Sequence, residues 1–521
     1  MIDITPYQLD IVINILKKYV PHCEVRAFGS RYKWTAKDYS DLDLAIVGNK
    51  KLDKKVIYDI KEAFSESDLP IRVDVLDWYA ISDEFKQIIN QGYEVIQKKE
   101  KQLPDGWEIK KLGDMVLISS SKRIFAREYV NSGIPFYRSK EIIQKQSGLS
   151  ISSELFISIE QFELIKLKYE VPKHGDLLLT SVGTIGIPYV VKNEDFYFKD
   201  GNLTWFKHWN GIESSFLYYW FLSGYGKQAL SKIVIGSTQK AITINALNNM
   251  SILIPPLQKQ KQIASILFSL DEKIDINNQI NNKLEEIAQA LFKQWFVDFN
   301  FPDENCSPYK DSGGAMIDSE LGKIPKGWQI INLNDYLDFI RGIEPGSKYY
   351  SNNKISEQYM QFIRVSDLKS LGDTYIHKSL AKDKLVNEYN VLMSFDGTIG
   401  RVRIGFSGAY SSGIRKVVNK VTNRNILNFS NQFVYFLLQT ENVQNIIITN
   451  ATGTTILHAG HTIKLLKIAI NNEVMNKFNE IILPLYQQLI INLKETKLLQ
   501  QIRDTLLPKL MSGEIDVTQG V

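Results

Sequence analysis

An internal repeat constrains this chain more than any other feature. The segment LPDGWEIKKLGDMV at 103–116 returns as IPKGWQIINLNDYL at 324–337, so that Trp107 matches Trp328 and Leu112 matches Leu333. Three further matches keep the same order: FYRSKEI at 136–142 with FIRVSDL at 362–368, SVGTIG at 181–186 with FDGTIG at 395–400, and GST at 236–238 with GTT at 453–455. The repeat predicts two domains of one fold, the first copy (103–256) and the second copy (324–472).

A long helical pattern follows each copy, at 257–299 and at 473–515. In both patterns mainly apolar residues, with a few polar ones, recur at alternating steps of four and three, which is the seam of a coiled coil. The first seam contains Ile263, Leu267, Leu270, Ile274, Asn277, Asn281, Leu284, Ala288, Leu291 and Trp295, and the second contains Phe478, Ile482, Leu485, Leu489, Asn492, Thr496, Leu499, Arg503, Leu506 and Leu510. At 1.5 Å per residue the first helix is about 60 Å long.

The polar and the helix-breaking residues of these two segments lead to separate expectations. Asn277 and Asn492 occupy equivalent seam positions, where a buried Asn fixes register and orientation, although solvation at a frayed seam is the alternative. Pro484 should kink the second helix, and Pro508 with Gly513 should end it. Between the copies, residues 300–323 are rich in turn formers and predict a linker.

Composition narrows the class of protein without deciding it. The 521 residues are 44% hydrophobic and 23% charged, with a formal net charge of +4, which predicts a multidomain protein and neither requires nor excludes nucleic acid. Two cysteines cannot form a disulfide framework, and the first ten residues lack the features of a signal peptide. No apolar stretch approaches the roughly 20 residues of a membrane helix. A cytoplasmic location without membrane contact is expected.

Residues 1–100 carry a separate motif. The apolar run 25–28 leads to Gly29 and Ser30, and ten residues later to Asp41 and Asp43 at the start of the predicted strand 42–47. Acids two apart on a strand share a face, so Asp41 and Asp43 can bind one divalent cation, and Asp74 on a second strand offers a third ligand. Gly29 lets the backbone approach a triphosphate, and Ser30 offers a hydroxyl and an amide.

This pattern resembles the minimal nucleotidyltransferase family, including its antitoxin members. The resemblance implies that Asp41, Asp43 and Asp74 are catalytic and hold Mg²⁺, and that Gly29 and Ser30 bind the phosphates of a nucleoside triphosphate. The alternative is a degenerate domain that is kept as an interaction surface. The acceptor of any transferred nucleotide is not readable from the sequence.

The chain after Lys101 resembles the specificity subunit of Type I restriction-modification systems. The resemblance rests on the two GW starts, the two GTIG segments, the opening PPLQKQKQIASILFSLDEKI of the first helix and the terminal LLPKLMSGEI. It implies an α/β multidomain protein, in which a nucleotidyltransferase-like domain precedes two mixed α/β target recognition domains separated by two long antiparallel coiled-coil helices. It also implies a bipartite reader of double-stranded DNA.

The same resemblance implies partners and cofactors. The partners are two methyltransferase subunits that bind S-adenosylmethionine and a motor and nuclease restriction subunit that uses ATP. The body has no GxxxxGK[ST] loop, no NPPY-like tetrapeptide and no Cys/His cluster, so it should not be catalytic itself.

Candidate DNA contacts lie in the repeated polar segments. They are Arg138 and Lys140 in the first copy, Ser237, Thr238, Gln239 and Lys240 after Gly236, and Arg364 and Lys369 in the second copy. Arginine can read guanine through two hydrogen bonds. However, domains that read different sequences should differ at base contacts and agree at scaffold positions, so the recurrence of Arg138 and Arg364 favours a scaffold role.

Two rival functions remain open at this stage. One is a nucleotidyltransferase whose long C-terminal part recruits a substrate. The other is a coiled-coil scaffold that binds DNA without reading its sequence, which would show as weak binding with a steep dependence on salt.

Overall fold

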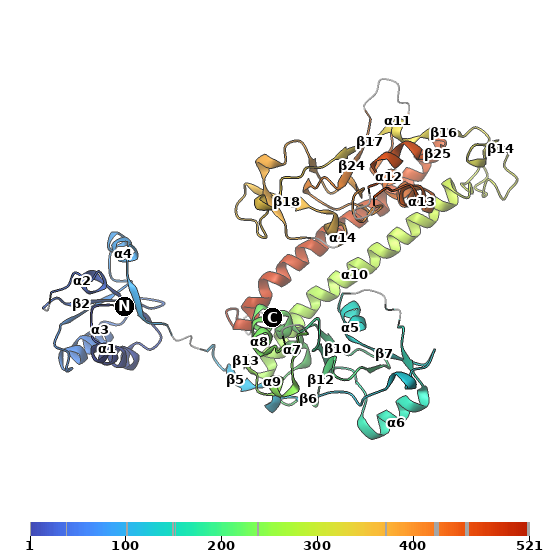
Figure 1. The fold of residues 1–521 in the computed structure, drawn as a ribbon. Coiled ribbons are helices and arrows are strands. Elements are labelled where there is room, and N and C mark those ends of the chain that lie inside the picture. Colours follow the sequence, from blue (N-terminus) through green and yellow to red (C-terminus); the bar gives the residue numbers. More distant parts are fainter. Residues whose placement is uncertain are drawn as a thin grey trace. The chain divides into compact units, whose positions relative to one another are not determined.

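The computed structural model describes residues 2–37, 39–99, 103–147, 151, 153–236, 239–369, 372–420, 427–453 and 458–517. The chain divides into two compact units, residues 1–110 with 251–256 and residues 111–250 with 257–521 (Figure 1). Strands β5 (Glu108–Lys111) and β13 (Ser251–Ile254) pair with each other and fall almost entirely in the first unit, although the repeat assigns them to the first copy. Within the described ranges, no helix has the length and apolar character that a membrane span requires.

The first unit contains a four-stranded sheet in the order β3-β2-β1-β4, in which only β2 and β3 run parallel. Its elements are α1 (Pro6–Tyr19), β1 (Glu24–Phe28), α2 (Gly29–Tyr32), β2 (Leu42–Val47), α3 (Lys54–Ser65), β3 (Val73–Asp77), α4 (Asp83–Asn90) and β4 (Glu94–Gln97). Apolar residues of α1 and α3 bury against β1 and β2 to form the core. The expected strand at 42–47 is confirmed.

The two copies are built from corresponding sheets, although the second sheet has three strands in the first copy and four in the second. The first copy contains the sheets β10-β9-β12-β6 and β11-β7-β8, and the second contains β22-β21-β24-β17 and β19-β18-β23-β20. The first copy comprises η1 (Leu112–Asp114), β6 (Leu117–Ser119), η2 (Ala126–Glu128), β7 (Ile134–Tyr137), α5 (Ser139–Gln146), β8 (Phe156–Ile157), α6 (Ile159–Tyr169), β9 (Leu177–Thr180), β10 (Pro188–Val190), β11 (Tyr197–Phe198), β12 (Leu203–Lys207), α7 (Ser214–Leu222), α8 (Gly224–Ile233) and α9 (Ile244–Asn248).

The second copy repeats this plan with a few additional short elements. It comprises β16 (Gln329–Asn332), α11 (Leu333–Tyr336), β17 (Leu337–Arg341), η3 (Ser347–Tyr349), β18 (Tyr359–Ile363), η4 (Val365–Leu368), β19 (Tyr375–His377), η5 (Lys378–Leu380), β20 (Leu385–Val386), β21 (Val391–Ser394), β22 (Val402–Arg403), β23 (Gly408–Tyr410), β24 (Ile414–Asn419), α12 (Asn431–Leu437), α13 (Glu441–Thr449), η6 (Gly460–Leu465) and β25 (Lys467–Ile470). Trp107, Trp328, Leu112 and Leu333 are all buried, which confirms the repeated positions as core anchors.

Helices α10 (Leu257–Phe296) and α14 (Asn472–Ser512) pack against each other along the predicted seam. Their contacts join Asp271 to Arg503 and Asn281 to Asn492, so the helices are antiparallel. The expected helix end near Pro508 and Gly513 is confirmed, because α14 runs through Pro484 and Pro508 and stops at Ser512. Gly513 ends the helix in the left-handed conformation at φ 72°.

Polar side chains are buried in the middle of this seam. Asn492 Nδ2 donates to Asn281 Oδ1 at 2.8 Å, and Asn277 Nδ2 donates to Glu495 Oε2 at 2.8 Å. By the repeat, Asn281 corresponds to Thr496, whose buried hydroxyl has no hydrogen-bond partner within the described chain. Asn277 and Asn492 are both buried, which excludes a frayed seam. Polar pairs in the seam therefore fix the register of α10 against α14. The pairs differ between the two halves of the seam.

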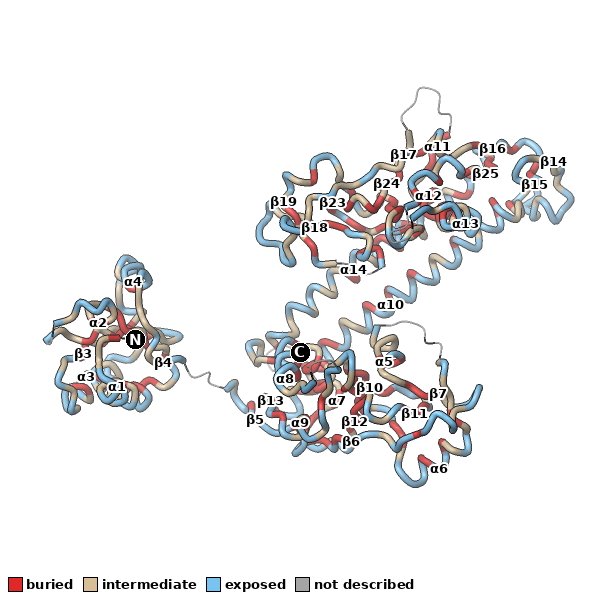
Figure 2. Tube along the Cα trace, viewed as in Figure 1, coloured by how far each residue is buried: buried red, intermediate tan, exposed pale blue. Residues whose placement is uncertain are grey.

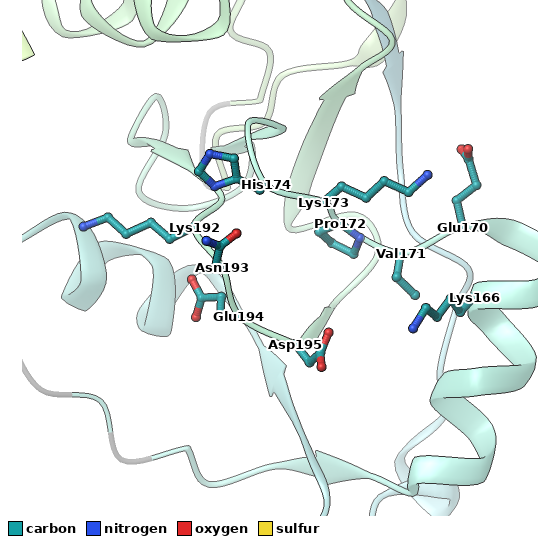
Figure 3. Close-up of a pocket in the computed structure, with 10 residues that line it drawn as sticks. All are labelled: Lys166, Glu170, Val171, Pro172, Lys173, His174, Lys192, Asn193, Glu194 and Asp195. Atoms are coloured by element: carbon teal, nitrogen blue, oxygen red, sulfur yellow. The ribbon is translucent and has the colours of Figure 1, made fainter.

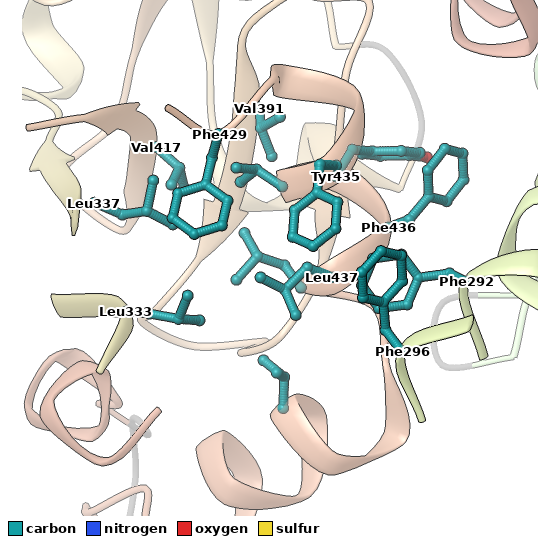
Figure 4. Close-up of a cluster of buried hydrophobic side chains, with 14 of the residues drawn as sticks. Phe292, Phe296, Leu333, Leu337, Val391, Val417, Phe429, Tyr435, Phe436 and Leu437 are labelled. Atoms are coloured by element: carbon teal, nitrogen blue, oxygen red, sulfur yellow. The ribbon is translucent and has the colours of Figure 1, made fainter. Parts of the chain in front are cut away.

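The C-terminal end of α10 belongs to the core of the second copy. Phe292 lies 5.2 Å from Phe433 and 5.5 Å from Phe478 between ring centroids, so α10, α12 and α14 share one aromatic cluster (Figure 4). The buried residues of both copies follow their sheets and the seam, whereas the outer faces of α10 and α14 are exposed (Figure 2). The segment expected as a linker contains the hairpin of β14 (Met316–Ser319) and β15 (Gly322–Pro325).

Replacing Asn492 tests the polar seam. Asn492→Ala leaves the buried Asn281 carbonyl without its donor, which should cost about 1–3 kcal/mol. We expect faster hydrogen exchange of the backbone amides of α10 and α14, measured on the full chain. The exposed Asn278→Ala on α10 is the matched control, and equal exchange in both variants would refute the assignment. Thr496→Val, which removes the unpartnered hydroxyl, should not accelerate exchange.

Candidate functional site

The three acids of the first unit meet where β2 and β3 begin. Asp43 pairs with Asp74 in the parallel register, and Asp41 directly precedes β2. Burial raises the pKa of Asp43, and the negative charges of Asp74 and Asp41 raise it further. The fold therefore brings the three predicted carboxylates within electrostatic reach of one another.

The chemistry of these acids fits a magnesium ion that is shared with a substrate. Within the described ranges, no three His, Cys, Asp or Glu side chains form a ready-made metal cluster. Mg²⁺ commonly takes one or two carboxylates and completes its shell with water and substrate phosphates. The Asp74 carboxylate also lies 3.4 Å from Lys61 Nζ, so its charge is partly balanced before any ion binds.

Gly29 packs directly against this carboxylate group. Its φ is +77°, and a Cβ placed on it would lie 2.1 Å from Asp43 Oδ2. No side chain fits there, so the position requires glycine for both its backbone and its space. Ser30 follows it at the start of the short α2 and is half-buried.

The sequence interpretation missed Arg31, which is buried. Its guanidinium donates to the Ser40 carbonyl at 3.0 and 2.8 Å and to the Asp3 carbonyl at 2.9 Å. Ser40 directly precedes Asp41, so Arg31 positions the backbone that carries the first acid. The only sequence signal for this role is an arginine next to the Gly-Ser pair.

In the first copy, Arg138 and Lys140 are engaged within the protein. Arg138 is the N-cap residue of α5, and its guanidinium pairs with the buried Glu141 at 2.7 Å and with Glu154 at 2.9 Å. Lys140 also pairs with Glu154, at 2.7 Å.

Arg364 takes the same place in the second copy. It is the N-cap residue of η4, and its backbone N–H donates to the carboxylate of Asp367 at 2.9 Å. Its Nε lies 3.6 Å from the same buried carboxylate. This shared arginine–acid cap favours a scaffold role for Arg138 and Arg364. Lys369 is exposed at the end of η4.

Two of the remaining candidates, Gln239 and Lys240, lie next to the glycine turn of the first copy. Ser237 and Thr238 lie outside the described residues, while Gln239 and Lys240 are exposed. The Lys240 carbonyl accepts from Gly183 N at 3.1 Å, and Ala241 bridges to Val182. The corresponding bridge in the second copy joins His458 to Asp396.

A cavity of about 700 Å³ opens in the first copy (Figure 3). It is lined by Lys166, Glu170, Val171, Pro172, Lys173, His174, Lys192, Asn193, Glu194 and Asp195. Its lining contains three lysines and three carboxylates. Glu170 is further paired with Lys207, and Glu194 with Lys145. The lining is balanced in charge and does not favour an anionic ligand.

Comparison with known proteins assigns both parts of the chain. Residues 104–286 match the family described as Type I restriction modification DNA specificity domain, and residues 11–101 match Polymerase beta, Nucleotidyltransferase. The MjaIX specificity subunit of Methanocaldococcus jannaschii is 28% identical over 80% of this chain and 95% of its own length. The probable protein adenylyltransferase MntA of Haemophilus influenzae is 55% identical over 19% of this chain and 88% of its own length.

The Type I restriction-modification S subunit of M. genitalium aligns with 79% of this chain and 98% of its own chain, at a TM-score of 0.48 and 14% identity.

These matches define a fusion of a nucleotidyltransferase domain with a duplicated DNA specificity body. The chain belongs to the specificity subunits of Type I restriction-modification systems, and its N-terminal domain belongs to the nucleotidyltransferase family of MntA. The specificity body is the non-catalytic part of the chain.

Replacing Gly29 tests whether the carboxylate group beside it binds a nucleotide. In Gly29→Ala the new Cβ must displace the Asp43 carboxylate, so we expect binding of Mg-ATP to the full chain to weaken about tenfold or more. Titration calorimetry measures this directly. Gly48→Ala is the matched control, because its Cβ meets the nearest atom only at 3.3 Å. Unchanged binding in Gly29→Ala would contradict the assigned site.

Proposed function

We propose that the chain reads the two halves of an asymmetric double-stranded DNA site, one half with each copy. The observation that carries this proposal is the pair of sheets with identical strand order but different side chains. Half-sites one turn of B-DNA apart are about 34 Å apart. A rigid pair of helices such as α10 and α14, each about 60 Å long, can bridge such a gap.

The two helices also carry corresponding exposed apolar residues. On α10 they are Ile266, Phe268, Ile276 and Ile287, and at the corresponding positions of α14 they are Ile481, Leu483, Ile491 and Ile502. Exposed apolar residues mark interaction surfaces. Two equivalent faces fit two copies of one partner, which we assign as methyltransferase subunits.

The catalytic roles lie with partner subunits in this proposal. The methyltransferase subunits bind S-adenosylmethionine and methylate adenine at the site that this chain selects. A motor and nuclease restriction subunit uses ATP and cleaves DNA. The specificity body contributes recognition and docking.

For the N-terminal domain we propose binding of Mg²⁺ and a nucleoside triphosphate, with nucleotidyl transfer to a protein as its activity. The sequence identity to an adenylyltransferase and the packing of Gly29 against Asp43 support this assignment. Asp41, Asp43 and Asp74 hold the ion, and Ser30 offers its hydroxyl to phosphate oxygens. When bound, Mg²⁺ neutralises phosphate charge. Arg31 keeps the loop that carries Asp41 in place.

Mapping of methylated adenines tests the recognition function. Cells that carry this gene and its partner methyltransferase gene are compared with cells that lack only this gene. We expect a two-part asymmetric motif with a fixed gap to vanish in the deletion strain. Asp43→Asn should retain the motif, because recognition does not use the N-terminal acids. An unchanged methylome in the deletion strain would refute the proposal, and loss of the motif in Asp43→Asn would favour an enzyme whose body recruits a substrate.

Charged substitutions test the two docking faces. Ile276→Glu and Ile491→Glu each place a charge in one apolar face, so each should reduce the bound methyltransferase subunits from two to one. The double variant should bind none. Native mass spectrometry of the purified complex measures the stoichiometry. The exposed Asn278→Glu on α10 adds the same charge beside the face and should retain both partners.

A further inference from the structure

The two copies can be superposed strand by strand through their hydrogen-bond registers. Thr204 on β12 faces Leu179 on β9, and Arg415 on β24 faces Met393 on β21. The central strands β9 and β21 lead directly into the two GTIG turns, where Gly183 and Gly397 have φ values of 77° and 75°. Thr204 and Arg415 therefore occupy the same place beside the same turn.

The edge strands and the facing loops extend this correspondence. Arg341 on β17 pairs with Arg415, and its equivalent in the first copy is Ser120, directly after β6. His458 bridges to the residue before the turn in the second copy, as Ala241 does in the first. The turns agree in geometry, while the residues that surround them differ in chemistry.

In the first copy these positions are small and neutral. Thr204 is buried and shares a hydrogen bond with Ser181, and Ser120 is exposed. The first copy therefore forms the same sheet and the same turn without any arginine at either place. A scaffold function does not require Arg341 or Arg415.

In the second copy two guanidinium groups converge on one carbonyl. Arg341 Nε donates to Ser412 O at 3.2 Å, and Arg415 Nη1 donates to the same oxygen at 2.6 Å. Burial lowers the pKa of Arg415, and the adjacent positive charge of Arg341 lowers it further, although Asp396 acts in the opposite direction.

The carboxylates around this pair are already engaged. Asp396 Oδ1 lies 2.7 Å from His458 Nδ1. Glu344 accepts from the Ser412 hydroxyl at 3.2 Å and from the Tyr350 hydroxyl at 2.8 Å. Neither forms an ion pair with Arg341 or Arg415 among the described residues. Two adjacent positive charges that have no carboxylate partner cost free energy, unless a ligand supplies hydrogen-bond acceptors.

We propose that Arg341 and Arg415 form a base-reading site that recognises guanine in the half-site of the second copy. This inference rests on the proposed function and deepens it. Arginine donates two parallel hydrogen bonds to O6 and N7 of guanine, which no other base accepts in that arrangement. Arg341 is exposed beside the turn, and the Ser412 contact holds its side chain by Nε, which leaves the terminal amino groups for the base.

Exchange of residues between the copies provides the test. Arg341→Ser with Arg415→Thr gives the second copy the residues of the first. A second double variant, Arg341→Lys with Arg415→Lys, keeps both charges but loses the planar fork that guanine recognition needs. Each is assembled as the full chain with its methyltransferase subunits, and binding is measured on duplexes with single base-pair changes in either half-site.

We expect both double variants to lose discrimination at one guanine of the second half-site, by about tenfold to a hundredfold. The first half-site is the internal control for folding and should be read as in the unsubstituted protein. Lys477→Ser removes a positive charge from α14 instead and should preserve the whole motif.

Two other results would overturn the inference. Equal weakening on every sequence, with recovery in the lysine variant, would identify a phosphate contact. Unchanged reading of both half-sites would show that neither arginine touches DNA. If the unsubstituted protein shows no two-part motif at all, the proposed function itself fails, so the two failures are distinguishable.

Discussion

The antiparallel contact between α10 and α14 is the interaction on which the rest of the body depends. Helix α7 of the first copy packs on α10, and α12 of the second copy packs on α14 and α10, so both copies are built onto the seam. Apolar side chains supply its stability, while Asn281 and Asn492 add a directional hydrogen bond that a slipped register would lose. Burying these amides costs free energy, but it defines the spacing between the copies.

Features of the fold that follow from a periodic or duplicated sequence pattern could be predicted. The heptad seam, the strand at 42–47 and the buried tryptophans follow from periodicity and from the duplication, because local pattern determines which face of an element is buried. The proximity of Asp41, Asp43 and Asp74 follows from the same reasoning, since acids on neighbouring parallel strands lie at one edge of a sheet.

Features that depend on distant partners could not be predicted. Arg31 acquires its role from the carbonyls of Asp3 and Ser40, and the Arg341 and Arg415 pair exists only because β17 and β24 are neighbours. In each case the deciding contact lies elsewhere in the chain.

The correspondence of the two seams has a consequence for how such a gene can change. Asn277 and Asn492 hold the same heptad position, so a recombination event that joins the two helices at corresponding codons keeps the seam in phase. The recombinant protein has a different target recognition domain joined to an unaltered pair of helices. A crossover within the helical segments therefore exchanges whole target recognition domains without changing how the helices pack. The long helices are the places where such junctions are tolerated.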